Sequence, residues 1–97
     1  MAPIARAADP RSIDVELYGV VRLRAGVDRV ALPAGTLAEV LGALARRCPA
    51  LAPELIRDGH ASAHLLVALD GREVIDDPAR PIAPGSCLVL TSAQAGG

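Results

Sequence analysis

The sequence contains no lysine, and all ten of its basic residues are arginine. It therefore has no side-chain amine that could form a Schiff base or accept an isopeptide bond from another copy. The formal net charge is −1, so the chain lacks the basic field that holds a nucleic-acid backbone, and we predict no nucleic-acid partner. Every uncharged apolar stretch is far shorter than the ~20 residues that span a bilayer, so we predict no membrane segment.

Aromatic residues and cysteines are almost as scarce. Tyr18 is the one aromatic residue, so the core must be built from leucine, valine and isoleucine. Cys48 and Cys87 are too few and too far apart for a metal knuckle or a disulfide framework, which favours reduced thiols. His60 and His64 would be about 13 Å apart along a strand, too far to share one ion. We therefore predict no metal site.

The length of 97 residues matches one domain. Residues 1–12 show no hydrophobic periodicity, and we expect a disordered N-terminal extension there. They also lack the continuous apolar stretch of a secretory signal, which favours a cytoplasmic protein. The expected organisation is thus an extension at 1–12, a domain at 13–91 and a flexible C-terminal tail at 92–97.

Two strands are expected at the start of the domain. Apolar and polar residues alternate in 13–23, as in a strand with one buried face. Gly26 and Asp28 interrupt the pattern, and a second short strand is expected at 29–33. The two strands are expected to form an opening hairpin.

The clearest helix follows, at 36–47. Thr36 and Glu39 have the spacing of a capping box, in which each side chain satisfies a free backbone N–H of the first turn. Pro49 disfavours helix at Cys48, so the helix is expected to end there. The apolar residues that recur with helical spacing predict one buried stripe: Leu37, Val40, Leu41 and Leu44.

The second half of the domain is expected to contain a hairpin. Residues 64–69 form a mostly apolar run of strand length. Asp70-Gly71 follows directly, and this dipeptide is typical of two-residue hairpin turns. A short return strand is therefore expected at 72–75.

The remaining segments are expected to be turns and one last strand. Pro53 and Gly59 bound what we expect to be a single helical turn. Residues 76–85 are predicted to be turn and loop, with Pro84-Gly85 suited to a type II turn. The final strand is expected at 87–91. Together these elements predict an α+β fold, a mixed sheet of four to five strands packed on one main helix.

No cluster of side chains suggests catalysis. Asp76 and Asp77 are adjacent in a proline-rich loop and are better explained as a solvated turn than as a general acid and base. Cys48 is expected at the negative end of a helix, which raises a thiol pKa. Cys87 is more simply a small buried or edge hydrophobe, with an accessory redox role left open. We predict no catalytic residue.

The chemistry is expected at the C-terminal tail instead. Six residues follow Thr91, and fully extended they would reach about 20 Å. Gly96-Gly97 has no Cβ atoms and can thread a narrow channel, delivering the α-carboxylate of Gly97, while Ala95 and Gln94 are expected to contact the partner. A carboxylate is a poor electrophile, so a partner must first activate it, for instance as an acyl-adenylate made with ATP. A sulfur nucleophile could then displace AMP and leave a thiocarboxylate.

Four segments carry a family resemblance: "VELYGVVRLRAG", "LPAGTLAEVLGAL", "LVALDGREV" and "IAPGSCLVLTSAQAGG". In this order they resemble the sulfur-carrier branch of the ubiquitin-like β-grasp proteins, the MoaD/ThiS family of molybdopterin synthase small subunits and thiamine sulfur carriers. The resemblance implies a β-grasp fold and a non-catalytic carrier with no permanently bound cofactor. It also implies that Gly97, the second residue of the diglycine after Gly96, is adenylated and thiocarboxylated.

The same resemblance implies three kinds of partner. They are an adenylating enzyme related to ubiquitin activators, a persulfide sulfur donor, and a sulfur-accepting enzyme such as the large subunit of molybdopterin synthase. Molybdopterin (molybdenum cofactor) biosynthesis is the favoured pathway. Ser86-Cys87 and Ser92-Ala93, however, stand where the molybdopterin subunits usually have acidic residues and prolines, which leaves the accepting pathway open.

Three alternatives remain at this stage. The chain could carry sulfur for thiamine, cysteine or natural-product biosynthesis. It could be a ubiquitin-like modifier, joined through Gly97 to lysines of other proteins. It could also be a β-grasp binding module with an inert tail.

An apolar docking patch for the partner is expected on the exposed sheet face near the tail. The candidates form two pairs, one pair in each of two strands: Leu88 or Val89, and Leu66 or Leu69. Both faces of these strands are apolar in sequence, so the choice within each pair is open.

Overall fold

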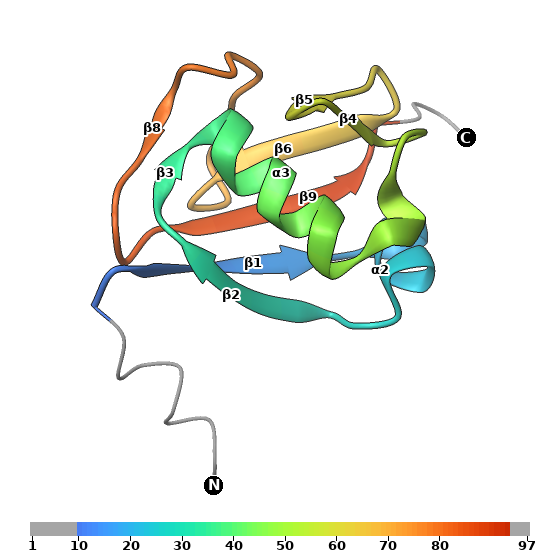
Figure 1. The fold of residues 1–97 in the computed structure, drawn as a ribbon, viewed down its shortest axis with the longest axis horizontal. Helices are drawn as coiled ribbons and strands as arrows, with labels where there is room; N and C mark the ends of the chain where they lie inside the picture. Colours follow the sequence, from blue (N-terminus) through green and yellow to red (C-terminus); the bar gives the residue numbers. More distant parts are fainter. Residues whose placement is uncertain (1–9, 94–97) are drawn as a thin grey trace, which may run out of the picture.

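The computed structural model describes residues 10–93 of the chain (Figure 1). Its helical elements are α2 (Gly19–Ala25), α3 (Leu37–Arg47) and the short 3-10 helix η1 (Pro49–Leu51). Its strands are β1 (Ser12–Leu17), β2 (Arg29–Pro33), β3 (Gly35–Thr36), β4 (Ile56–Arg57), β5 (His60–Ala61), β6 (Leu65–Leu69), β7 (Glu73–Val74), β8 (Pro81–Ile82) and β9 (Cys87–Ser92). Most of the predicted N-terminal extension, residues 1–9, lies outside the described residues.

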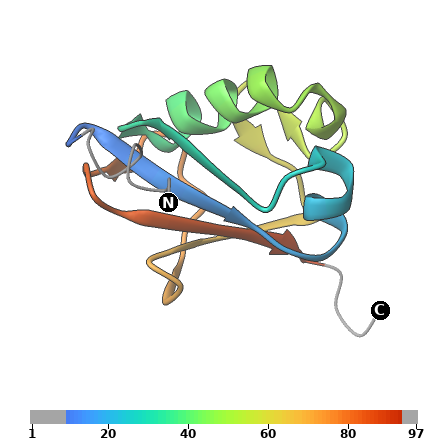
Figure 2. The same cartoon turned by 90° about the horizontal axis from the view of Figure 1, so that it is seen from below.

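Five of these strands form one mixed sheet in the order β2-β1-β9-β6-β7. β1 and β9 run parallel at its centre, and the other neighbours are antiparallel. Helix α3 covers one face of this sheet, and the opposite face carries no helix within the part of the chain that the structure describes (Figure 2). This arrangement confirms the predicted α+β fold with a mixed sheet on one main helix.

The first predicted strand is wrong in its second half. β1 ends at Leu17, and Gly19 takes a positive φ of 59° that turns the chain into α2 instead of continuing the strand. α2 ends at Gly26, which adopts the left-handed conformation with φ 80° and donates its N–H to the carbonyl of Arg22 at 2.9 Å. β1 and β2 still pair antiparallel as expected, but a helix joins them.

Helix α3 begins and ends where the sequence predicts. Thr36 N–H donates to Glu39 Oε1 at 2.9 Å, and Glu39 N–H donates to Thr36 Oγ1 at 3.2 Å, which completes the capping box. Cys48 caps the C-terminal end just before Pro49. The buried residues of α3 are the four of the predicted stripe: Leu37, Val40, Leu41 and Leu44.

Both tight turns predicted from dipeptides are present. Asp70 and Gly71 have φ values of 54° and 70°, which is the pair of positive values that a type I′ hairpin turn requires. Gly85 has φ 87°, and Ser86 N–H donates to the Ala83 carbonyl at 3.1 Å, as in a type II turn. These turns place β7 beside β6 and direct β9 into the centre of the sheet.

The segment after α3 differs from the expectation. The helical turn lies before Pro53, in η1, where Pro49 occupies a first helical position that suits proline. Between Pro53 and Gly59 the chain instead enters the small hairpin β4–β5, which turns at Asp58 and Gly59, both with positive φ. A second unpredicted pair joins β3, directly before α3, to β8, which lies within the expected loop at 76–85.

The core is one aliphatic cluster between α3 and the sheet, as the lack of aromatic residues predicts. No polar or charged residue is buried within residues 10–93. Across the same residues, no helix is long and apolar enough to cross a membrane.

Candidate functional site

The C-terminal end of β9 is the point from which the predicted tail departs. β9 pairs with β6 as far as Ser92, opposite Leu65, and Ala93 N–H still donates to the His64 carbonyl at 3.0 Å. The strand therefore continues one residue beyond the predicted end at Thr91. Four predicted tail residues follow and lie outside the described residues, so the roles predicted for them stay predictions: Gln94, Ala95, Gly96 and Gly97.

Helix α2 flanks this end of β9. Tyr18, just before α2, donates its N–H to the Leu90 carbonyl at 3.0 Å. A Cβ placed on Gly19 would lie 3.7 Å from Thr91 Oγ1, so the start of the helix lies close to the C-terminal end of β9. Helix α2, whose residues the sequence predicts to be part of a strand, therefore lies beside the end of β9 from which the predicted tail departs.

The sheet register decides which predicted docking residues face outward. Leu88 is fully buried beneath α3, whereas its neighbour Val89 is half-buried on the opposite, open face. In β6, Leu66 lies on the open face, and Leu69, which pairs with Leu88, packs against the core. The open face therefore carries Val89 and Leu66, and the alternatives Leu88 and Leu69 are wrong because they lie on the side of α3.

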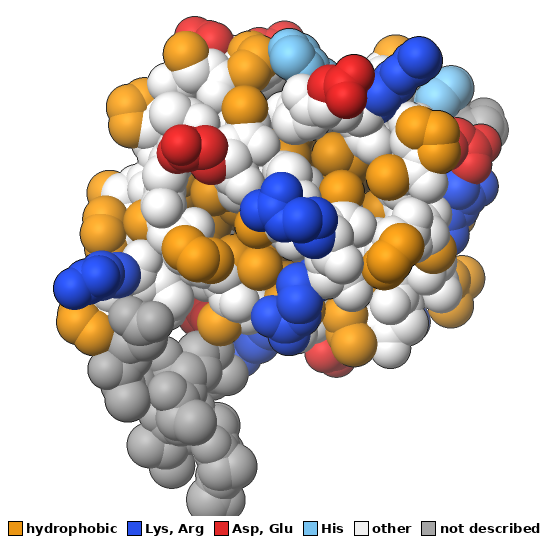
Figure 3. Space-filling view, viewed as in Figure 1, with side chains coloured by type: hydrophobic (Ala, Val, Ile, Leu, Met, Phe, Trp, Pro, Cys, Tyr) orange, Lys and Arg blue, Asp and Glu red, His pale blue; other side chains and the backbone are white. Residues whose placement is uncertain are grey.

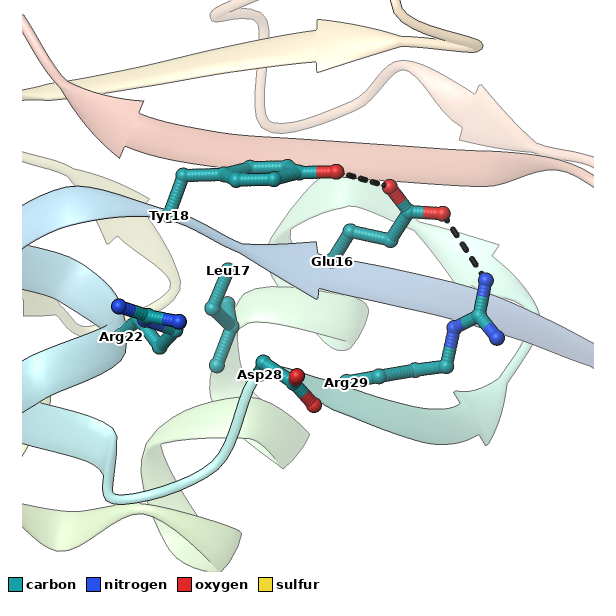
Figure 4. A pocket seen from close by; sticks show the side chains of 6 residues that line it. All are labelled: Glu16, Leu17, Tyr18, Arg22, Asp28 and Arg29. Carbon is teal, nitrogen blue, oxygen red and sulfur yellow. Dashed lines mark hydrogen bonds and ion pairs between the residues drawn. The ribbon is translucent and has the colours of Figure 1, made fainter.

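The rest of the open face is polar toward β2. Glu16 accepts a hydrogen bond from the Tyr18 hydroxyl at 2.6 Å and another from Arg29 Nη2 at 3.1 Å (Figure 4). These bonds, that of Tyr18 first, lower the pKa of Glu16, and the bond to Glu16 raises the pKa of Tyr18. The three side chains rim an open pocket of about 350 Å³ that Arg22 and Asp28 also line.

Neither cysteine is arranged as a nucleophile. Cys48 is buried under the end of α3, and this burial raises the pKa of its thiol. Cys87 lies in the central strand, not at an edge, and burial together with the carboxylate of Glu16 raises its pKa to about 11. Both thiols are therefore protonated at neutral pH. Within the described part of the chain, no three metal-binding side chains gather at one place.

The largest exposure of apolar side chains is at α2, which sequence reasoning missed. Leu23 is 75% exposed, Val20 50% and Val27 41%, and Tyr18 beside them is 49% exposed. Val21 is the one buried residue of this helix. The sequence does not reveal this helix because the apolar residues of 19–23 continue the alternation of β1, which predicts one strand over 13–23.

The face formed by α3 has a different character. Figure 3 shows arginine side chains near the middle of this face, with apolar side chains around them in small groups. Exposed apolar surface is thus not gathered into one patch there, and the candidate site remains the open sheet face and the end of β9.

Comparisons with known proteins identify the fold. No protein-family model and no curated protein sequence matches the chain. Among solved structures, SAMP1 from Haloferax volcanii is similar at 26% identity and a TM-score of 0.75, over 89% of this chain and 99% of that one.

Two structures of molybdopterin proteins are also similar. A putative molybdopterin converting factor subunit 1 from Pyrococcus furiosus shares 18% identity, with a TM-score of 0.64 over 84% of this chain and 95% of that one. A chain from the complex of subunits 1 and 2 of the molybdopterin-converting factor of Helicobacter pylori shares 20% identity, with a TM-score of 0.60 over 89% and 99%. At these identities both structures show the fold alone.

The sheet order, the single covering helix and these neighbours define a ubiquitin-like β-grasp protein. SAMP1 and the two molybdopterin-converting factor chains are the neighbours expected of a MoaD/ThiS-type ubiquitin-like protein, in agreement with the resemblance stated from the sequence.

Proposed function

We propose that this chain is a sulfur carrier in which the α-carboxylate of Gly97 is activated by a partner enzyme and converted to a thiocarboxylate. The observation that supports this most is the position of β9. It is the central strand of the sheet, and the last backbone hydrogen bond described for it is that of Ala93, four residues before Gly97. A rigid body would thus hold a short segment that ends in diglycine.

The proposed reaction has three steps. A carboxylate oxygen of Gly97 attacks the α-phosphorus of ATP on the partner, which releases pyrophosphate and forms the acyl-adenylate. The terminal sulfur of a persulfide donor attacks the acyl carbon, and AMP leaves. A thiol then attacks the donor's own sulfur atom in the acyl disulfide, the one not bonded to the acyl carbon. The S–S bond breaks, a new disulfide forms between the thiol and the donor, and the thiocarboxylate remains on Gly97.

The rest of the chain is suited to carrying such a group because it offers few competing nucleophiles. With no lysine in the sequence, the acyl-adenylate has no side-chain amine of its own protein to acylate. The raised pKa of Cys48 and of Cys87 keeps both thiols protonated, and the thiolate is the reactive form. Sulfur would therefore be added at the C-terminus rather than lost to an internal side chain.

The partners follow from this chemistry. We propose an adenylating enzyme related to ubiquitin activators, a persulfide donor and a sulfur-accepting synthase. The Helicobacter pylori neighbour forms a complex with a second subunit of the molybdopterin-converting factor, which supports an acceptor of that kind and a role in molybdopterin synthesis. We propose that the chain acts in the cytoplasm. On this chain, Val89 and Leu66 of the open sheet face are the proposed docking residues, with Gln94 and Ala95 entering the partner beside Gly96.

Intact mass spectrometry tests the proposal directly. The purified protein, incubated with its adenylating enzyme, ATP and a persulfide donor, should gain about 16 Da, the difference between sulfur and oxygen. Deletion of Gly97 should abolish the gain and leave the fold intact, because β9 ends before it. A mass gain that persists in the truncated protein would contradict the role of Gly97.

A second function has a specific observation in its favour. The neighbour with 26% identity is SAMP1, whose full name is small archaeal modifier protein 1. The same activated Gly97 could acylate lysines of other proteins. Diglycine remnants on lysines of cellular proteins, dependent on Gly97, would favour modification, and a thiocarboxylate without such remnants would favour sulfur transfer.

A further inference from the structure

The surface of α2 exposes more apolar side chain than its packing requires. A seven-residue helix that buries one side chain, Val21, gains little stability from the core, yet Val20, Leu23 and Val27 stand in solvent. Exposed apolar residues that gather in one place mark interaction sites more often than scattered ones do. We name the set Tyr18, Val20, Leu23 and Val27, together with Arg22, the α2 surface.

This surface is hollowed and continuous with the open sheet face. The pocket rimmed by Glu16 and Tyr18 shares Arg22 and Asp28 with a second shallow pocket of about 400 Å³. Leu23 and Val27 line that second pocket. Figure 4 shows the Arg22 side chain reaching from α2 toward Leu17, apart from the bonded pair Tyr18 and Glu16.

The distance from the body to the reacting group limits where a partner can bind. Ala93 is the last residue that the sheet holds, and four residues extend at most about 14 Å. An enzyme that acts on the carboxylate of Gly97 must therefore bring its active site within about 14 Å of the end of β9. A globular enzyme that close has to lie against the elements around that end, and α2 is one of them.

We propose that the α2 surface is a second docking surface for the enzyme that activates Gly97, in addition to the open sheet face. This second proposal rests on the proposed function, because the partner is the enzyme that activates Gly97. The partner presents an apolar surface to Leu23, Val20 and Val27, because these side chains are 75%, 50% and 41% exposed in the described part of the chain. It presents a carboxylate to Arg22, whose guanidinium has no hydrogen bond or ion pair recorded to another described residue.

The geometry explains why two surfaces are needed. The open sheet face supplies Val89 and Leu66, which are only half-buried, and a flat surface of that kind fixes orientation weakly. The α2 surface lies at the end of the sheet, so contact with both surfaces would prevent the carrier from rotating about the tail. The tail would then enter the nucleotide pocket in one direction.

Steady-state kinetics of activation test the proposal. The rate of ATP–pyrophosphate exchange is measured against carrier concentration for the adenylating enzyme of the same organism, which gives KM and kcat for the carrier. Leu23→Ser should raise KM about tenfold, as expected for an apolar residue central to an interface, with kcat little changed. Arg22→Glu should raise KM at low salt and lose most of its effect at high salt.

Two matched variants serve as controls. Ala83→Ser makes an exposed apolar side chain polar in the turn before β9, at the end of that strand opposite Ala93, and Arg72→Glu reverses a charge at the hairpin turn away from the end of β9. Both should leave KM within about twofold of the original chain. Circular dichroism should show the same thermal transition for Leu23→Ser as for the original chain, because Leu23 is exposed.

The results separate this proposal from the one on which it rests. If the original chain is activated and Leu23→Ser has an unchanged KM, the second docking surface is wrong and the carrier function stands. An equal rise in KM for Ala83→Ser would also overturn it. If the original chain is not activated at all, both proposals fail. If Leu23→Ser instead abolishes self-association of the carrier with KM unchanged, the surface serves a second copy of the chain and the proposal is overturned.

Discussion

The Tyr18 hydroxyl lies 2.6 Å from the Glu16 carboxylate and donates a hydrogen bond to it, while Arg29 holds the other carboxylate oxygen at 3.1 Å. These bonds lower the pKa of Glu16 below its ordinary value of about 4.3. A group with a lowered pKa in the folded state contributes stability that is present above its unfolded pKa and is lost as pH falls through its folded pKa. The hydrogen bonds of Glu16 therefore stabilise the folded protein at neutral pH, and this contribution is lost in acid.

The first prediction concerns the pH dependence of stability. The free energy of unfolding should decrease below about pH 4, because Glu16 loses its charge there, as do Glu54 and Glu73, whose pKa values are lowered by Arg24 and Arg80. Glu16→Gln should show a smaller decrease between pH 6 and pH 3, measured from urea midpoints. A decrease equal to that of the original chain would mean that Glu16 contributes nothing to it.

The second prediction concerns the capping box of α3. Thr36→Ala removes the oxygen that accepts from Glu39 N–H and should lower the free energy of unfolding by about 1 kcal/mol. Thr36→Ser keeps the hydroxyl and should cost much less. Urea denaturation of the two variants checks this, and equal losses would show that the methyl group, not the hydrogen bond, is responsible.

The third prediction compares two glycines with similar backbone conformations. Gly59 and Gly71 have φ values of 77° and 70°, but a Cβ on Gly59 would lie 3.0 Å from the Ala38 carbonyl oxygen, whereas a Cβ on Gly71 meets nothing within 4 Å. Gly71→Ala should cost about 1–2 kcal/mol, the strain of a left-handed residue. Gly59→Ala should cost more, because the hairpin β4–β5 must also move away from α3. Equal losses of unfolding free energy would show that the contact with Ala38 relaxes freely.

The features predicted well from the sequence are those set by local chemistry. The capping box of Thr36 and Glu39 and the Asp70-Gly71 turn each involve residues close in sequence, so a few residues determine their geometry. The same holds for the buried stripe of α3, which depends on spacing alone. These elements determine most of the β-grasp order and hence the family resemblance.

The features that sequence reasoning missed depend on contacts between distant segments. Helix α2 continues the alternation of β1, and the interruption at Gly19 becomes visible only when its positive φ is known. In β9, apolar Leu88, Val89 and Leu90 follow one another, so the buried face is decided by pairing with β6 and by the position of α3. The tail residues 94–97 lie outside the described residues, and their chemistry remains a proposal.

The fourth prediction concerns the reactivity of Cys87. With a pKa of about 11, about one thiol in a thousand is ionised at pH 8, against roughly a quarter for an ordinary cysteine of pKa 8.5. Iodoacetamide should therefore alkylate Cys87 about a hundredfold more slowly than a free thiol at pH 8. Mass spectrometry of Cys48→Ser over time measures this rate alone. Alkylation as fast as that of the same variant in urea would contradict the protection by the fold.

The fifth prediction uses two adjacent residues of β9 that face opposite ways. Leu88→Arg forces a charge into the core beneath α3 and should prevent folding, because an unpaired buried charge costs several kcal/mol. Val89→Arg places the same side chain on the open sheet face and should leave the thermal transition close to that of the original chain. Because both variants introduce arginine, a difference in their stability reports which face of the sheet each position occupies.

Val89→Arg also tests the proposed docking on the open face. If the adenylating enzyme packs against Val89 and Leu66, the added guanidinium has to be desolvated at the interface, and the KM for the carrier should rise by about tenfold or more. Leu66→Arg, from the neighbouring strand, should have an effect of the same size. A folded Val89→Arg protein that gains the 16 Da of a thiocarboxylate with an unchanged KM would show that the enzyme does not bind this face. Recognition would then have to reside in the tail and the end of the sheet beside it.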